Sequence, residues 1–202
     1  GKLFVMLGER GQRDLSQSLA HGQGKVMRLN ADGTVPDDNP FVATADAQKE
    51  IWSFGHRNIQ GAALNPTTGD LWTTEHGPMG GDEVNVTRAG RNYGWPLITY
   101  GREYSGGQVG DGATAREGLE QPLHYWVPSI ASSGMAFVTT DTYPSWKGSV
   151  LIGGLAGKTL ARLVLDGEKV TKEERLLTDL GQRIRDVREA PDGRIYVLTD
   201  ED

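Results

Sequence analysis

Residues 53–96 read SFGHRNIQGAALNPTTGDLWTTEHGPMGGDEVNVTRAGRNYGWP, and the segment Gly69–Glu75 within this stretch decides the fold. The segment is a glycine followed by a short, mostly apolar run with strand character. The same pattern returns at Gly1–Glu9, Gly148–Gly154 and Gly193–Asp200. Two of the copies follow a cluster of turn residues, as expected where a tight turn leads into a strand. The sequence therefore predicts a repeated strand unit.

The composition supports a chain of short strands. It has 28 glycines in 202 residues, about twice the average usage, together with nine prolines. Frequent glycine and proline favour short elements joined by tight turns. Further strands are expected between the copies at 25–30, 50–54, 83–87, 123–127, 135–140, 159–166 and 185–188. Helical patterns are short and weak, at 46–51 and 172–177.

The spacing of the copies favours a β-propeller. Successive copies begin 45 to 79 residues apart, which is near or above the length of about 40–50 residues typical of one propeller blade. The repeated strands are apolar on both faces, which predicts burial on two sides. A β-sandwich is the alternative, but it explains the repeated pattern less well. We expect residues 1–202 to form one all-β domain, a partial β-propeller with long inserted loops.

Charge and hydropathy exclude some classes of function. The net charge of −6 argues against a nucleic-acid-binding surface. No apolar run approaches the roughly 18–20 residues needed to cross a membrane. The absence of cysteine excludes disulfides and thiolate metal sites.

Two Gly-rich turns carry candidate metal ligands. Glu75–Pro78 ends a repeat strand, so it reads either as the rim of a binding site or as an ordinary polar turn. Gly80–Glu83 offers carboxylate oxygens of the kind that calcium prefers, although a solvated acidic turn has the same pattern. The spacing does not match a calcium-binding helix–loop–helix. A zinc site built on the histidines is not supported, since neither the spacing nor a third ligand is present.

Two arginine motifs are candidates for anion binding. Arg57 and Asn58 follow an apolar strand and offer planar bidentate recognition and an amide. Arg183 and Arg185 lie two residues apart, so an extended backbone places both on one face. Such a pair can bind a polyanion, or it can protect an exposed strand edge.

These motifs together resemble one family. The blocks FGHRNIQGAALNP, EHGPMGGDEVN, NYGWP, SGMAF and GQRIRDVREAPDGRIYVLTDED are similar, in order, to the soluble sugar dehydrogenases that depend on pyrroloquinoline quinone (PQQ), within the glucose/sorbosone dehydrogenase family. The chain resembles the C-terminal portion of the aldose sugar dehydrogenases. The resemblance implies a six-bladed propeller, of which this chain covers roughly four blades, and PQQ and Ca²⁺ as cofactors.

The resemblance also implies a role for individual residues. Arg57 and His76 match catalytic positions, and the cofactor-binding positions are matched by Asn58, Gln60, Lys158, Arg183 and Arg185. Calcium positions are matched by the backbone carbonyls of Gly77 and Pro78, and a second, structural calcium by Glu83 with the carbonyl of Tyr93. The lysine that contacts PQQ in the family aligns with Ala156, so Lys158, two residues later, is the candidate replacement. No residue of the chain matches the histidine base of the family.

The implied reaction is oxidation of aldose sugars at C1 to lactones, by hydride transfer to calcium-bound PQQ. The implied partners are the sugar and an electron acceptor, and the implied location is the periplasm or outside the cell. Because the first copy of the repeat begins at Gly1, we expect the chain alone to be inactive and to associate with a preceding segment or a second copy. The alternatives are a non-catalytic propeller fragment that binds a ligand or partner, and a propeller lactonase or sugar lyase.

Overall fold

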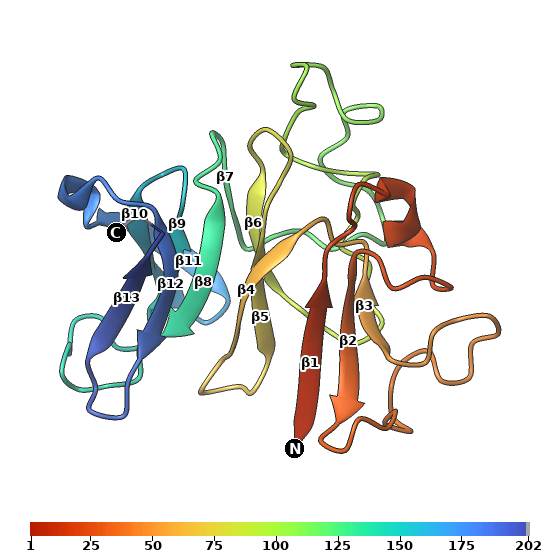
Figure 1. Cartoon of the computed structure of the whole chain (residues 1–202), viewed down its shortest axis with the longest axis horizontal. Coiled ribbons are helices and arrows are strands. Elements are labelled where there is room, and N and C mark those ends of the chain that lie inside the picture. The colour runs from red at the N-terminus through yellow and green to blue at the C-terminus, as the bar shows by residue number, and fades with distance from the viewer. Residues whose placement is uncertain (201–202) are drawn as a thin grey trace. The chain divides into compact units, whose positions relative to one another are not determined.

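Four antiparallel β-sheets of two to four strands make up most of the regular structure of residues 1–200 (Figure 1). The computed structural model describes residues 1–200 and contains two short 3₁₀ helices, η1 (Arg13–Gln17) and η2 (Thr178–Leu180), but no α-helix in that range. In each sheet, strands that follow one another in the sequence lie side by side. The first three sheets are β1 (Lys2–Leu7), β2 (Lys25–Asn30) and β3 (Ile51–Phe54); β4 (Ile59–Leu64), β5 (Leu71–Glu75), β6 (Asp82–Val86) and β7 (His124–Trp126); and β8 (Ser132–Phe137), β9 (Val150–Gly154), β10 (Thr159–Asp166) and β11 (Lys169–Leu176). The last sheet pairs β12 (Ile184–Glu189) with β13 (Ile195–Thr199).

The chain divides into two compact units. The first comprises Gly1–Ile59, Gly77–Met79 and Thr87–Gln121, and it contains the β1–β3 sheet. The second comprises Gln60–His76, Gly80–Val86 and the chain from Pro122 onward, and it contains the other three sheets. The expectation of a single domain over 1–202 stays a prediction.

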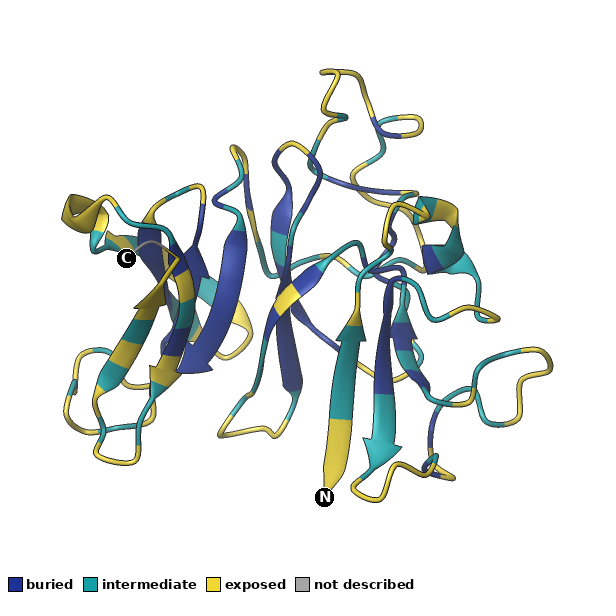
Figure 2. Ribbon diagram, in the orientation of Figure 1, coloured by how far each residue is buried: buried dark blue, intermediate teal, exposed yellow. Residues whose placement is uncertain are grey.

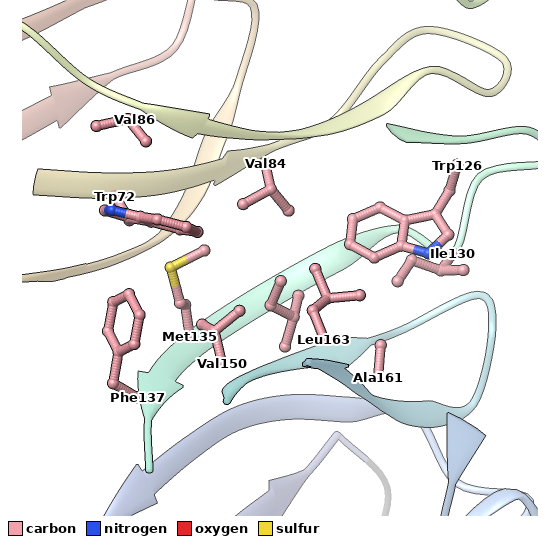
Figure 3. Close-up of a cluster of buried hydrophobic side chains, with 11 residues drawn as sticks. Trp72, Val84, Val86, Trp126, Ile130, Met135, Phe137, Val150, Ala161 and Leu163 are labelled. Carbon is pink, nitrogen blue, oxygen red and sulfur yellow. The ribbon is translucent and has the colours of Figure 1, made fainter. Parts of the chain in front are cut away.

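The core of the second unit lies between two sheets. Trp72 and Val84, from β5 and β6, face Met135 and Val150, from β8 and β9 (Figure 3). Trp72 is fully buried and its ring meets Phe137 edge to face, with centroids 5.3 Å apart. Burial of an aromatic side chain of this size contributes several kcal/mol to folding, on the order of 3–5 by truncation to alanine.

Glycines allow successive sheets of this unit to approach closely. A Cβ at Gly61 on β4 would lie 2.3 Å from the carbonyl oxygen of Ser133 on β8. A Cβ at Gly134 on β8 would lie 2.7 Å from the Cα of Asp186 on β12. No side chain fits at either position, so the first strand of each sheet contacts the first strand of the next.

Most expected strands are present with bounds within three residues, and 25–30 and 159–166 are confirmed without change. The expected helix at 172–177 is wrong, because these residues belong to the outer strand β11. The weak helix at 46–51 is also wrong, since the chain there forms turns that lead into β3. Strand β4 was not expected.

Burial of the repeated strands on both faces is confirmed for β5 and β9 but wrong for β1 and β13 (Figure 2). Those two strands keep exposed apolar side chains, including Leu3 and Leu198. None of the helices in residues 1–200 is long and apolar enough to span a membrane.

Candidate functional site

The Arg57–Asn58 turn of the first unit follows β3 and rests on a buried polar frame. The ring of His56 is fully buried. Its Nε2 shares a 2.8 Å hydrogen bond with Ser53 Oγ, and the ring stacks on Tyr93 with centroids 4.5 Å apart. The guanidinium of Arg57 lies over the ring of Trp95, 5.3 Å from its centroid. Cation–π contact of this kind restrains the guanidinium of Arg57.

The NYGWP motif supplies that frame. The Tyr93 amide donates to the Phe54 carbonyl at 2.8 Å, and the Trp95 amide donates to the Gly55 carbonyl at 2.8 Å. The motif is therefore bonded to the end of β3, directly before Arg57. The family resemblance assigns to Tyr93 only a carbonyl for calcium, whereas its ring also packs on His56.

A buried ammonium group supports the same turn and was not expected from the sequence. Lys25 is fully buried, and its Nζ donates to the carbonyls of Leu15, Ser16 and Gln23 at 2.9, 2.9 and 2.6 Å. Burial lowers the pKa of Lys25 to about 8. The Ser16 carbonyl also accepts from the Gly55 amide at 3.0 Å, so the lysine ties η1 to the segment that carries Arg57.

Gly77 and Pro78 are buried, and the residue after them is bonded to a distant loop. The amides of Met79 and Arg102 donate to each other's carbonyls at 2.9 and 3.1 Å. This pairing fixes the backbone directly after the two predicted carbonyl ligands, Gly77 and Pro78.

In the second unit, β5 and β6 bring two carboxylates and an amide together. Glu75 and Glu83 are directly opposite in the strand pairing, and like charges in that arrangement repel. The Asn85 amide nitrogen bridges them, with Nδ2 at 3.3 Å from Glu75 Oε1 and 3.2 Å from Glu83 Oε2. Burial, followed by the charges of Glu75 and Asp82, raises the pKa of Glu83 to about 8.

The amide oxygen of Asn85 is buried and accepts no hydrogen bond from the residues that the structure describes. Asn85 was not selected from the sequence as a ligand, although it lies two residues after Glu83 and so on the same strand face. The neighbouring Asp82 is fully buried, so it is not the solvated acid that the turn pattern also allowed. Its carboxylate accepts bonds from Ser129 and Ser132. Among residues 1–200, no group of three or more His, Cys, Asp or Glu side chains is placed to hold a metal ion.

His76 follows β5 and is half-buried. Its Nε2 lies 2.7 Å from the Ser132 carbonyl oxygen. A carbonyl only accepts, so Nε2 donates this hydrogen bond.

The arginine pair at the start of β12, Arg183 just before it and Arg185 within it, contacts a single carboxylate. Arg185 donates to both oxygens of Asp200, from Nε at 2.8 Å and from Nη2 at 2.7 Å, and Arg183 Nε donates to Asp200 Oδ2 at 3.2 Å. These bonds lower the pKa of Asp200 to about 2. The two guanidinium groups therefore converge on one carboxylate, as predicted for a pair on one face. Asp200 was not selected from the sequence, since only the β12–β13 pairing brings it there.

The remaining predicted residues lie at the surface of the second unit. Gln60 is exposed on β4, and Lys158 is exposed in the turn between β9 and β10. Lys158 has a positive φ of 45°, which is uncommon for a residue with a side chain. Asn58, in the first unit, is half-buried.

The family model described as Glucose / Sorbosone dehydrogenase matches residues 1–202. The chain belongs to the glucose/sorbosone dehydrogenase family. It is 51% identical over 202 residues to the aldose sugar dehydrogenase YliI of Escherichia coli strain K12, a match that covers all of this chain and 54% of the relative.

Two solved structures from this family are similar to the chain. The crystal structure of the soluble aldose sugar dehydrogenase of E. coli in the apo-form superposes with a TM-score of 0.96 at 51% identity, covering all of this chain and 58% of that one. The PQQ-bound form of the aldose sugar dehydrogenase of Streptomyces coelicolor superposes with a TM-score of 0.77 at 30% identity, covering 98% and 52%. The family member is thus all-β and of the β-propeller fold class, as predicted. It spans about half the length of the curated relatives it matches.

Proposed function

We propose that this protein contributes to the PQQ-dependent oxidation of aldose sugars at C1. The observation that carries the proposal is the convergence of Arg183 and Arg185 on a carboxylate, in a chain similar to a protein whose solved structure contains PQQ. The aldose, an electron acceptor and a periplasmic or extracellular location are parts of the same proposal. They are supported by the family relationship.

The arginine pair fits a cofactor with several carboxylates. Asp200 occupies it in the structure, so the geometry for gripping a carboxylate is present without a ligand. The side chains of Arg183 and Arg185 are 39% and 44% exposed beside Asp200. The unused N–H edges are available for a second carboxylate.

The Glu75–Glu83–Asn85 cluster fits calcium. It offers carboxylate and amide oxygens, which are the ligands that calcium prefers. A buried Asn85 oxygen without a donor and a Glu83 carboxyl with a raised pKa are both relieved when a cation binds there. Glu83 remains the predicted ligand, and the structure adds Asn85 to the candidates.

The residues of this chain have separate tasks in the proposed reaction. Bound PQQ supplies the two-electron acceptor for C1 of the sugar, and calcium beside it supplies a Lewis acid. Arg57 and Asn58 orient polar groups of the cofactor and sugar through hydrogen bonds, and Gln60 adds an amide. Arg183 and Arg185 bind the cofactor carboxylates, with Lys158 as a further cation.

The calcium beside PQQ is assigned to the carbonyls of Gly77 and Pro78, by resemblance. The structural calcium is assigned to Glu83 and the Tyr93 carbonyl. His76 is proposed to line the same site, with its ring held by the hydrogen bond from Nε2 to the Ser132 carbonyl.

The test is reconstitution of the purified chain with PQQ and calcium. PQQ binding is measured by calorimetry, and aldose oxidation is followed by dye reduction. Binding that requires calcium and saturates at one PQQ per chain supports the proposal. Binding without dye reduction agrees with the expected inactivity of the chain alone, and no binding at all in the presence of calcium overturns the proposal.

A further inference from the structure

Asp200 is a carboxylate of the second unit to which the proposed function gives no task of its own. It follows β13 directly, and its amide donates to the Arg183 carbonyl at 3.0 Å. This backbone bond extends the hairpin of β12 and β13 by one residue, so it brings the Asp200 side chain next to Arg183 and Arg185. The two arginines lower the pKa of Asp200 to about 2, and Asp200 is therefore ionised at neutral pH.

A β-bulge in β12 falls on Arg185. The strand pairs Ile184 with Thr199 of β13, and its next paired residue is Asp186, opposite Leu198. Arg185, between them, has no partner residue in the strand pairing. A bulge adds one residue to a strand and can re-aim a side chain, and bulges are frequent next to active sites. Here it coincides with the arginine that donates two hydrogen bonds to one carboxylate.

The atoms that bind Asp200 decide which edges of the guanidinium groups remain for a ligand. Arg185 donates from Nε and Nη2, which form one edge of its planar group, and Arg183 donates from Nε. A guanidinium has five N–H groups in a fixed plane. Among residues 1–200, Nη1 of Arg185 and both Nη atoms of Arg183 donate no hydrogen bond. The Nη1–Nη2 end of each arginine therefore keeps N–H groups for a second carboxylate.

Asp200 could affect an anionic ligand in two opposite ways. Its negative charge repels a carboxylate, which weakens binding. Its bonds also order two long side chains before a ligand arrives, and an arginine that is already ordered loses less conformational entropy on binding. The second effect is favoured by the geometry, because Asp200 uses the Nε side of each arginine and leaves the opposite end for the ligand.

We infer that Asp200 is a positioning residue, which holds Arg183 and Arg185 by their Nε sides and presents their Nη1–Nη2 ends to the carboxylates of PQQ. The identity of the ligand rests on the proposed function, whereas the orientation of the arginines does not. Asp200 stays bonded to both arginines when the cofactor binds. Its loss makes the pair more positive but frees both side chains, so affinity for the anionic cofactor should fall.

The first measurement is calorimetric titration of the full 202-residue chain with PQQ at fixed calcium. Asp200→Ala should raise the Kd by roughly two- to tenfold, the factor that corresponds to ordering one arginine side chain. Asp200→Asn loses the charge but keeps an amide oxygen that can accept from Nε, so its Kd should be lower than that of Asp200→Ala. A Kd for Asp200→Ala equal to or below that of the wild type overturns the inference, because repulsion by Asp200 would then outweigh any ordering.

The second measurement needs no ligand. The Nε–H groups of Arg183 and Arg185 are observed in ¹H–¹⁵N NMR spectra of the same chain and assigned with Arg183→Lys and Arg185→Lys. In the wild type, both signals should be shifted by the carboxylate and exchange slowly with water. In Asp200→Ala, both should move to the position of solvent-exposed arginines, and signals that stay unchanged overturn the inference.

Folding of the variants is not expected to limit the test, since an exposed ion pair contributes little to stability. If Asp200→Ala does not fold, Asp200→Asn decides. Its neutral amide oxygen is a weaker acceptor than a carboxylate, so both Nε–H signals should shift part of the way, and wild-type signals in that protein overturn the inference.

Asp141→Ala is the matched control. It removes another aspartate of the second unit, whose Oδ1 accepts from Lys147 Nζ at 2.7 Å, and it changes the net charge by the same amount. It should leave the PQQ Kd and the arginine signals unchanged. Equal effects of Asp141→Ala and Asp200→Ala would show that net charge alone acts, and would overturn the inference.

The two measurements separate failure of the inference from failure of the proposed function. If the wild type binds no PQQ, the proposed function fails, and the NMR spectra alone decide whether Asp200 orients the arginines. If the wild type binds PQQ and Asp200→Ala binds it equally well, the proposed function stands and the inference fails.

Discussion

Replacement of Arg185 by alanine tests the cofactor site most directly. Arg185 presents two N–H groups to one carboxylate, from Nε at 2.8 Å and Nη2 at 2.7 Å, which is the fork geometry that any carboxylate ligand requires. Loss of one charge-assisted bond to the cofactor costs about 1.5–3 kcal/mol. Since about 1.4 kcal/mol corresponds to a tenfold change in affinity, Arg185→Ala should raise the Kd for PQQ by roughly ten- to a hundredfold.

Arg185→Ala should affect PQQ affinity much more than it affects folding stability. The ion pair of Arg185 with Asp200 is partly exposed, and exposed pairs contribute only about 0–1 kcal/mol to folding. Arg185→Ala should therefore melt within a few degrees of the wild type while its PQQ affinity falls. Arg185→Lys keeps the charge but loses the fork, so its Kd should be intermediate.

Arg116→Ala is the control for charge and exposure. Arg116 is 41% exposed, against 44% for Arg185, and it also pairs with an aspartate, at 2.5 Å from Asp111 Oδ2. Calorimetric titration of the three variants and the wild type with PQQ at fixed calcium gives the Kd values. Equal values for Arg185→Ala and Arg116→Ala would refute the assignment of the arginine pair.

Three further predictions concern calcium, backbone packing and pH. Calcium at about a hundred times its Kd should stabilise the chain by roughly 2.7 kcal/mol, seen as a higher Tm that a chelator reverses. Glu83→Gln should abolish most of this shift, and an unchanged Tm in the wild type would contradict the site. In urea unfolding, Gly24→Ala should lower the free energy of unfolding more than Gly33→Ala. Both glycines have a positive φ, but only at Gly24 would the Cβ lie 2.4 Å from the backbone oxygen of His56. Equal losses would show that the clash is relieved. The arginines lower the pKa of Asp200 from 3.8 to about 2, so its contribution to stability is fully present above pH 3.8 and is lost as the pH falls through about 2. The difference in unfolding free energy between the wild type and Asp200→Asn should therefore shrink over that acid range, and a difference independent of pH would count against the pairing.

The sequence alone determined the fold class and much of the strand pattern. A glycine followed by an apolar run specifies a strand locally, because turn chemistry and β-propensity act over a few neighbouring residues. For the same reason, the bounds 25–30 and 159–166 agreed with β2 and β10. The convergence of Arg183 and Arg185 was predictable too, since it follows from the two-residue period of an extended chain.

The missed elements depend on contacts that local patterns do not show. Strand β4 contains Gln60, Gly61 and two alanines, a composition with weak strand preference, and it is defined by the close approach of Gly61 to the backbone of β8. Strand β11 reads as a charged, weakly helical segment. It is a strand because β10 pairs with it along its length and its Glu174 neutralises the buried Arg162.

Only the tertiary structure decided the environment of the candidate site. Asp82 stands next to Glu83 in the sequence, yet alternate residues of a strand point to opposite faces, and Asp82 binds a turn some 50 positions away. The Asp200 carboxylate meets Arg185 across a hairpin, and the Ser132 carbonyl meets His76 from another sheet. The sequence determines the chemistry of each side chain, but strand pairing and sheet packing bring distant residues within hydrogen-bond distance and so decide which partner sets its charge state or orientation.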